Sequence, residues 1–585
     1  MANIKEKTID PERGDVNEAT SDEDVQQLEY VDTNGDDLAS VDVQNKNAVK
    51  GDDSDGKVDW NWRQRIAVMC LVGLYTGSQI PVYFTAGPLT FITAELGGTA
   101  SAAWLPVSYG LALAAVVPIC GYFQDLLGRR YVCLLGGCLL IIGCIVMGTA
   151  HKFRDGLVGM VLCGSGAAIG EMTALAGTSE LVPVKRRPIY VAILTVVTLP
   201  FIPSVLESQL LAKYYTWRWG YWICLIWNAI CFVGLLFTYF PVTQTRARSK
   251  DVKRIFTKID YPGIILSLTG TTLFLVALQA GGYTHSWTSA YVLCQLLIGI
   301  VLMVCFVIWE WKYARYPMVP PELFKGQRIV TVAYLVSAVG GINFASLVNL
   351  LPTEFSTVYD SDPVQVGLKG LSTGGAILVG AFIGNLLLHR LIRWTREVVL
   401  FYLVLMTAFT GAFSIANPDN AKMSVAFATL GGFGVGGIIA PVATIAMMAC
   451  PDTLIATCAA LSLCVRALGG AMGYAIYFNV FNSKLKTALP ARVAEYALAA
   501  GLPVSNTATF VETFLTVPHQ VSTIPGVTPE IIQAAIIGSR WGYSDAFRWV
   551  WISSIPFGVC AIIVACFLPN LAKHSTNRIA AKIAH

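Results

Sequence analysis

The sequence predicts an all-α membrane protein with 14 transmembrane helices, and two observations carry this prediction. The 585 residues are 55% hydrophobic and only 13% charged, with a mean hydropathy of +0.59. Soluble domains carry about a quarter charged residues, so most of this chain is expected to face hydrocarbon. The chain also contains 14 apolar runs of the length, about 20 residues, that a helix needs to cross a bilayer.

The predicted spans fall into groups of six, two and six along the chain. The first six lie near 65–89, 102–123, 131–150, 156–180, 189–211 and 219–240, two follow near 261–280 and 290–311, and the last six lie near 329–351, 365–388, 397–415, 422–449, 454–481 and 546–568. Residues 1–59 carry 17 acidic and 6 basic side chains and few large apolar ones. We predict that they form a disordered acidic tail, not a cleavable signal.

Basic residues indicate which connections lie in the cytoplasm. They collect in every second connection, in the pair Arg129 and Arg130 and in the runs Lys185–Arg187, Arg246–Lys258, Lys312–Arg328 and Arg390–Arg396. Because Lys and Arg accumulate in cytoplasmic loops, both chain ends are expected in the cytoplasm. The long segment 482–545 is then extracytoplasmic, and we predict a partly helical cap there.

A short charged hinge from Gly121 to Arg130 separates the second and third spans. Gly121 and Gly128 carry no side chain, so they permit a close helix contact or a sharp turn. Asp125 is suited to capping or pairing at a helix end, while Arg129 and Arg130 place the hinge on the cytoplasmic side. Without further information, the hinge could also be an ordinary basic turn.

Three ionisable side chains lie within apolar spans: Glu171, Glu207 and Arg466. Charges inside a membrane are costly, so each is a candidate for binding protons or substrate. The alternative is structural: the acids would satisfy neighbouring polar groups, and the arginine would fix helix packing. In the fifth span, Pro200 and Pro203 predict a kink, which would either open space toward a cavity or be a fixed bend.

Other chemistries find little support. The 15 cysteines lie in or beside apolar runs without a Cys-x-x-Cys pair, and the six histidines are scattered, so we predict no metal site. The phosphate-loop-like stretch 51–57 is followed by Val58, where a magnesium-binding Ser or Thr is required, and Gly370–Gly374 matches a nucleophile motif only inside an apolar span. We therefore expect no enzyme, no cofactor and no nucleic-acid partner.

Aromatic residues on the central helices, such as Phe344 and Tyr474, could line an apolar cavity, or they could pack against neighbouring side chains or lipid.

The hinge, read as Gly-x-x-x-Asp-x-x-Gly-Arg-Arg, resembles the loop signature between helices 2 and 3 of the major facilitator superfamily. Trp217–Trp219 and Ile259–Gly263 are similar to motifs of its 14-span drug:proton antiporters. Within that group, Gly177–Pro183 and Leu199–Val205 resemble fungal trichothecene efflux pumps.

This resemblance implies a major facilitator fold with two six-helix bundles, at 60–240 and 313–568, and two extra helices within 241–312; residues 569–585 would be a cytoplasmic tail. It implies proton-driven export of hydrophobic or amphipathic molecules by alternating access, from a monomer in the plasma membrane or, alternatively, a vacuolar or vesicle membrane. Asp125, Arg129 and Arg130 would form a cytoplasmic latch, with Glu180 and Lys185–Arg187 as partners.

Two residue patterns depart from the family, and the alternatives stay open. Met160 stands where many proton antiporters carry an arginine, and Leu126 stands where a basic residue usually follows the aspartate. If protons are coupled, Glu171 is the expected carrier. The alternatives are an uptake carrier, for example of a ferric siderophore, and a transporter-like sensor.

Overall fold

The computed structural model describes residues 61–242, 259–324, 328–359, 362–516, 518–576 and 582–583. The predicted acidic tail at 1–59 and the whole basic run Arg246–Lys258 lie outside these residues. The described chain is nearly all helical, and within it 14 helices are long and apolar enough to cross a membrane, which confirms the predicted number of spans. Two-residue strands β1 (Pro241–Val242) and β2 (Lys582–Ile583) pair antiparallel.

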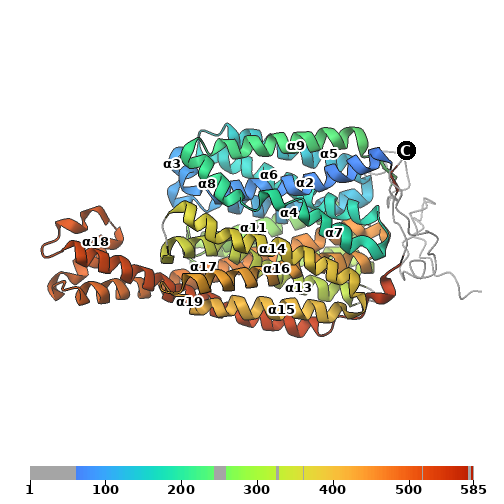
Figure 1. Ribbon diagram of the computed structural model, residues 1–585. Coiled ribbons are helices and arrows are strands. Elements are labelled where there is room, and N and C mark those ends of the chain that lie inside the picture. Colours follow the sequence, from blue (N-terminus) through green and yellow to red (C-terminus); the bar gives the residue numbers. More distant parts are fainter. Residues whose placement is uncertain are drawn as a thin grey trace, which may run out of the picture.

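Two groups of helices lie against each other along their length (Figure 1). The first, which we call lobe 1, contains α2 (Trp62–Ala86), α4 (Trp104–Leu127), α5 (Arg129–Gly148), α6 (Phe153–Glu180), α7 (Arg187–Val196), α8 (Ser204–Tyr214) and α9 (Arg218–Thr238), with the short α3 (Leu89–Leu96) between α2 and α4. The second, lobe 2, contains α13 (Ile329–Glu354), α14 (Pro363–Arg390), α15 (Thr395–Ala412), α16 (Ala421–Ala449), α17 (Ile455–Ala499) and α19 (Pro529–Ala565). The lobes meet where α4 packs on α17 and α7 packs on α14.

Close helix contacts in both lobes depend on glycines. A Cβ at Gly166 would overlap the backbone of α5, one at Gly436 would overlap the carbonyl of Ile377 in α14, and one at Gly469 would overlap Ala338 in α13. Small residues one turn apart let backbones approach where lipid gives no hydrophobic drive for helix association. These three glycines are therefore packing positions.

The fifth span is broken at the two prolines. α7 ends at Val196, a single 3-10 turn covers Leu199–Phe201, and α8 begins at Ser204 with Pro203 as its N-cap. Proline lacks the amide hydrogen that continues a helix, which explains the break. The predicted kink is thus a full interruption.

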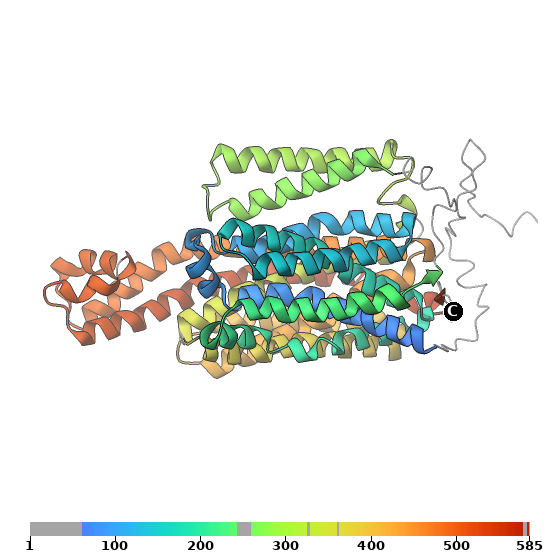
Figure 2. The same ribbon diagram turned by 90° about the horizontal axis from the view of Figure 1, so that it is seen from above.

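The extra pair, α11 (Tyr261–Ala280) and α12 (Ala290–Lys312), lies beside the two lobes (Figure 2). α11 contacts both α4 and α17, while α12 packs on α11 and leaves most of its apolar surface exposed. Surface of this kind on a membrane-length helix is expected to face lipid.

A helical projection extends from one end of the lobes (Figure 1). It consists of the end of α17, α18 (Thr507–Thr516) and the start of α19, around a small core that includes Val493, Phe510 and Ile531. The predicted span limits at 481 and 546 are therefore not helix ends. α17 has 45 residues and α19 has 37, and at about 1.5 Å per residue both greatly exceed a hydrocarbon core of about 30 Å.

Candidate functional site: a cavity between the lobes and a closed end

A cavity of about 610 Å³ lies between the lobes. Its lining includes Tyr83, Phe344, Val348 and Tyr474, with polar Gln79. A neighbouring cavity of about 190 Å³ shares several of these residues and extends to Phe201 and Pro203 at the break in the fifth span. The wall is thus mostly apolar with a few hydrogen-bonding groups. Of the two alternatives that the sequence left open for Phe344 and Tyr474, the structure shows that both line a cavity.

The cavity lies toward one end of the lobes. On α4 it is lined by Pro106 and Gly110, near the start of the helix, and on α13 by the exposed Asn349 and Thr353, near its end. Asp125, at the other end of α4, is buried. At about 1.5 Å per residue, the 15 or so residues between Gly110 and Asp125 separate these levels by roughly 22 Å.

Glu171 and Arg466 meet at the wall of this cavity. Arg466 Nη2 on α17 donates a hydrogen bond to Glu171 Oε2 on α6 over 3.0 Å, so the ion pair joins the two lobes. The Glu171 side chain is 2% exposed and that of Arg466 is 20% exposed. Two sequence candidates on different spans therefore form one unit, which neither span indicated alone.

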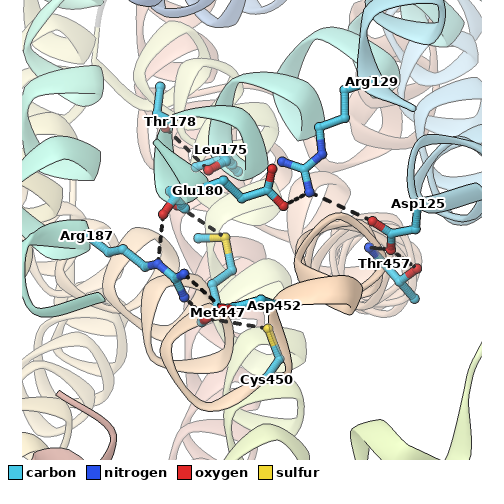
Figure 3. Close-up of polar contacts among 11 residues, drawn as sticks. Asp125, Arg129, Leu175, Thr178, Glu180, Arg187, Met447, Cys450, Asp452 and Thr457 are labelled. Atoms are coloured by element: carbon cyan, nitrogen blue, oxygen red, sulfur yellow. Dashed lines mark hydrogen bonds and ion pairs between the residues drawn. The ribbon is translucent and has the colours of Figure 1, made fainter. Parts of the chain in front are cut away.

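At the opposite end, α4 is bonded directly to α17. Asp125 Oδ2 accepts hydrogen bonds from the backbone N–H of Thr457 (2.8 Å) and from its hydroxyl (2.6 Å) (Figure 3). Gly121, one turn earlier, faces Ala460 of α17 with no room for a side chain. We call the level of these contacts the closed end.

Arg129 joins the closed end from within lobe 1. Its guanidinium pairs with Glu180 at the end of α6 and lies 3.8 Å from Asp125 (Figure 3). Gly128 between α4 and α5 has φ of 92°, a left-handed conformation that favours glycine and turns the chain sharply. Arg130 points elsewhere: it donates to the carbonyl of Leu236 in the same lobe. Among the described contacts it does not bridge the lobes, so its predicted share in a latch between them is not seen.

Arg187, at the start of α7, makes a second bridge at this end. It donates from Nε to the carbonyl of Ser179 (2.8 Å), from Nη1 to the carbonyl of Met447 in lobe 2 (2.6 Å), and pairs with Asp452 at 3.5 Å (Figure 3). The side chain is 1% exposed. Every one of these lobe-to-lobe contacts would have to break for this end to open.

The remaining candidates have simpler places. Glu207 lies in the first turn of α8, half-buried, and lines neither of the two cavities. Thr457 and Asp452 were not singled out from the sequence, because nothing local distinguishes them from other polar residues at helix starts. In the described residues no group of three or more His, Cys, Asp or Glu side chains could hold a metal ion.

At the end of the lobes away from the closed end, a clasp explains the Trp217–Trp219 motif. Glu95, in α3, accepts hydrogen bonds from Arg218 (2.5 Å) and from the Trp217 indole (2.7 Å), and Arg218 also donates to the carbonyl of Ala150. The hydrogen bond from Arg218 holds the pKa of Glu95 below its ordinary value.

Known transporters share this architecture. The model of the family described as fungal trichothecene efflux pump (TRI12) matches residues 70–585. The trichothecene efflux pump TRI12 of Fusarium sporotrichioides is 25% identical over 511 residues, which cover 85% of this chain and 84% of that protein. The efflux pump dotC of Dothistroma septosporum is 31% identical over 353 residues, 57% of this chain and 58% of that protein.

Solved structures agree on the fold. An auto-inhibited peptide transporter of the POT family has a TM-score of 0.51 at 14% identity, covering 86% of this chain and 97% of its own. The human organic anion transporter MFSD10 has a TM-score of 0.50 at 12% identity, covering 86% of this chain and all of its own. With the family match over most of its length, the chain is a transporter of the major facilitator fold and belongs to the fungal trichothecene efflux pump family.

Proposed function

We propose that this protein exports hydrophobic or amphipathic small molecules, such as a fungal toxin, secondary metabolite or drug, by alternating access in exchange for protons. The observation that carries the proposal is the mostly apolar cavity between the two lobes, which lies toward the end opposite the contacts of the closed end. Efflux is the activity that the names of two relatives print. A small-molecule site of this kind is concave and mostly apolar, with few polar groups to orient its ligand.

The lining supports an amphipathic, largely uncharged substrate. Tyr83, Phe344 and Tyr474 offer flat apolar faces, and Gln79 and Asn349 offer hydrogen bonds. The ionised groups on the wall, Glu171 and Arg466, neutralise each other. A strongly charged substrate would leave its own charge without a free partner there, which is costly in a poorly hydrated site.

Proton coupling is assigned to Glu171. A carboxyl buried at 2% exposure and paired across the lobes changes the stability of the lobe contact when it takes up a proton, because the neutral acid no longer attracts Arg466 as an ion. Proton binding and lobe separation are then linked, as exchange requires. No cofactor is needed beyond the proton gradient.

Orientation and location are part of the proposal. With both chain ends in the cytoplasm, the closed end is cytoplasmic and the cavity lies toward the outside, so a proton would enter from outside and the substrate would leave there. We place the protein in the plasma membrane as a monomer, with a vacuolar or vesicle membrane as the alternative.

Purified protein in vesicles of known orientation tests this function. A fluorescent amphipathic dye is loaded on the closed-end side, a proton gradient is applied, and dye and proton fluxes are followed together. Wild type should move dye from the closed-end side of the membrane to the other side, while protons move toward the closed-end side. Glu171→Gln should lose proton movement, while Glu512→Gln, at an exposed site on α18, should not.

The same assay separates the alternatives. Dye movement only toward the closed-end side would support uptake instead of export. No movement of the dye or of a ferric siderophore, with binding retained, would support a sensor. Unchanged proton flux in Glu171→Gln would refute the role given to that carboxyl.

A further inference from the structure

A second pair of buried acids lies where the extra helices meet lobe 1, away from the cavity. Asp260 belongs to the Ile259–Gly263 motif and caps the start of α11, and Glu310 lies in the last turn of α12. They are 8% and 7% exposed. Neither takes part in the cavity or in the contacts of the closed end.

Each carboxyl uses one oxygen and leaves the other without a partner. Asp260 Oδ1 accepts hydrogen bonds from the Gly263 N–H (3.1 Å) and the Trp309 indole (2.8 Å), and Glu310 Oε2 accepts from the Val319 N–H (3.1 Å). Asp260 Oδ2 and Glu310 Oε1 have no hydrogen-bond donor in the described residues.

The two unpartnered oxygens face the same small space. Both lie within 3.0 Å of the point where a Cβ on residue 263 would stand, and only a glycine leaves that point empty. Two ionised carboxylates so placed repel each other, whereas one shared proton turns the repulsion into a hydrogen bond. The arrangement therefore fits a single added proton.

Among the residues that the structure describes, the groups hydrogen-bonded to the pair are uncharged. From α4, the Tyr122 hydroxyl accepts a hydrogen bond from the Asp260 N–H (3.2 Å). From the connection after α12, the backbone of Met318 and Val319 is bonded to Glu310. Arg315 in that connection lies over the ring of Tyr316. Within the described part of the chain, no Lys or Arg forms an ion pair with either acid.

The pair is linked to the closed end through α4. Tyr122 is fully buried one turn before Asp125, and it packs with Leu126, Ile259 and Met318 in a small apolar cluster. A charge change at the two acids thus acts on the part of α4 that contacts α17.

We propose that Asp260 and Glu310 form a proton-binding site that fastens the extra helix pair to α4. With one proton the two carboxyls hold each other and α11 stays docked on Tyr122. When the proton leaves, two negative charges face each other in a buried space and the contact weakens. This site is separate from the exchange assigned to Glu171, and it makes the fit of the extra helices depend on pH.

Infrared difference spectroscopy of the full-length protein in detergent tests the proposal. Subtracting the spectrum of Glu310→Gln from that of wild type at neutral pH should leave the carbonyl band of one protonated carboxylic acid. The same subtraction with Glu530→Gln, an exposed site on α19, should leave no carbonyl band of a protonated acid. A difference spectrum that shows only carboxylate bands for Glu310→Gln would overturn the shared proton.

Thermal unfolding gives an independent readout. A group that holds its proton in the folded state stabilises at low pH and loses that contribution as the pH rises through its folded pKa. The midpoint of wild type should therefore fall with rising pH more steeply than that of Glu310→Gln or Asp260→Asn, whose amides stay neutral. Equal slopes in wild type and in both variants would refute the link to docking. Neither readout uses a substrate, so failure here leaves the proposed export untouched.

Discussion

Replacing Gly121 by alanine tests whether the closed end requires direct contact between α4 and α17. A Cβ at this position would lie 3.1 Å from the Ala456 carbonyl oxygen and 3.3 Å from Thr457 Cα, and it would overlap the Ala460 methyl group. Carbon atoms pack at about 3.5–4.0 Å, so the helices must move apart. Overpacking of this kind costs about 1–3 kcal/mol.

The cost falls on one state of the transporter only. When the lobes separate at the closed end, the new methyl group no longer overlaps α17. The overpacking cost therefore destabilises only the closed state, and the equilibrium between the closed and separated states shifts by that whole free energy. Since about 1.4 kcal/mol is a factor of ten, the shift is roughly 5- to 150-fold. The hydrogen bonds of Asp125 to Thr457, one turn away, should lengthen with it.

The assay uses a variant whose native cysteines are replaced and which carries a single new cysteine in place of Thr457. A membrane-impermeant thiol reagent then labels this cysteine. Gly121→Ala should raise the labelling rate from the closed-end side by that factor. Gly110→Ala is the matched control, because it lies on the same helix with no atom within 4 Å of its Cβ. If both variants label at the wild-type rate, the close contact at Gly121 does not hold this end shut.

Three further predictions concern single contacts. Asp125→Ala should abolish most transport without preventing membrane insertion, because it leaves the buried N–H and hydroxyl of Thr457 unpaired at a cost of about 1–3 kcal/mol. Asp419→Ala, an exposed site, should transport normally, and equal transport by both would contradict the latch. Glu95→Gln should lower stability by about 0.2–1 kcal/mol at neutral pH. Because the pKa of Glu95 is lowered from 4.5, that difference should vanish as the pH falls below this value, and a difference that persists in acid would exclude the ion pair as its cause. Gly436→Ala should reduce the yield of folded monodisperse protein by overlapping the carbonyl of Ile377, whereas Gly374→Ala, which meets open space, should not; matching yields would show that this contact is dispensable.

Much of the architecture was accessible from the sequence because a bilayer imposes a length and a polarity on each helix. The count of 14 spans follows from that constraint. The positions where the long helices end could not be predicted from the sequence. The helices at 481 and 546 continue past the bilayer because polar segments are also helix formers, and hydropathy reports only where the lipid ends.

The residues of the candidate site also differ in how readily the sequence reveals them. Glu171 and Arg466 stand out in the sequence because an ionisable group in an apolar span is costly. Asp125 stands out through the motif of the charged hinge. Their partners do not stand out. Thr457 is one of many polar residues, and its bonds to Asp125 join positions 332 residues apart.

The sequence by itself determined what kind of solvent surrounds this chain, how many times it crosses that solvent and which charges it places there. Only the tertiary structure decided that Glu171 faces Arg466, that one end of the lobes is sealed while the other leads to a cavity, and that Asp260 faces Glu310. The physical reason is that hydrophobic burial is a property of each segment alone, whereas a hydrogen bond or ion pair exists only between two atoms that folding has brought within about 3 Å.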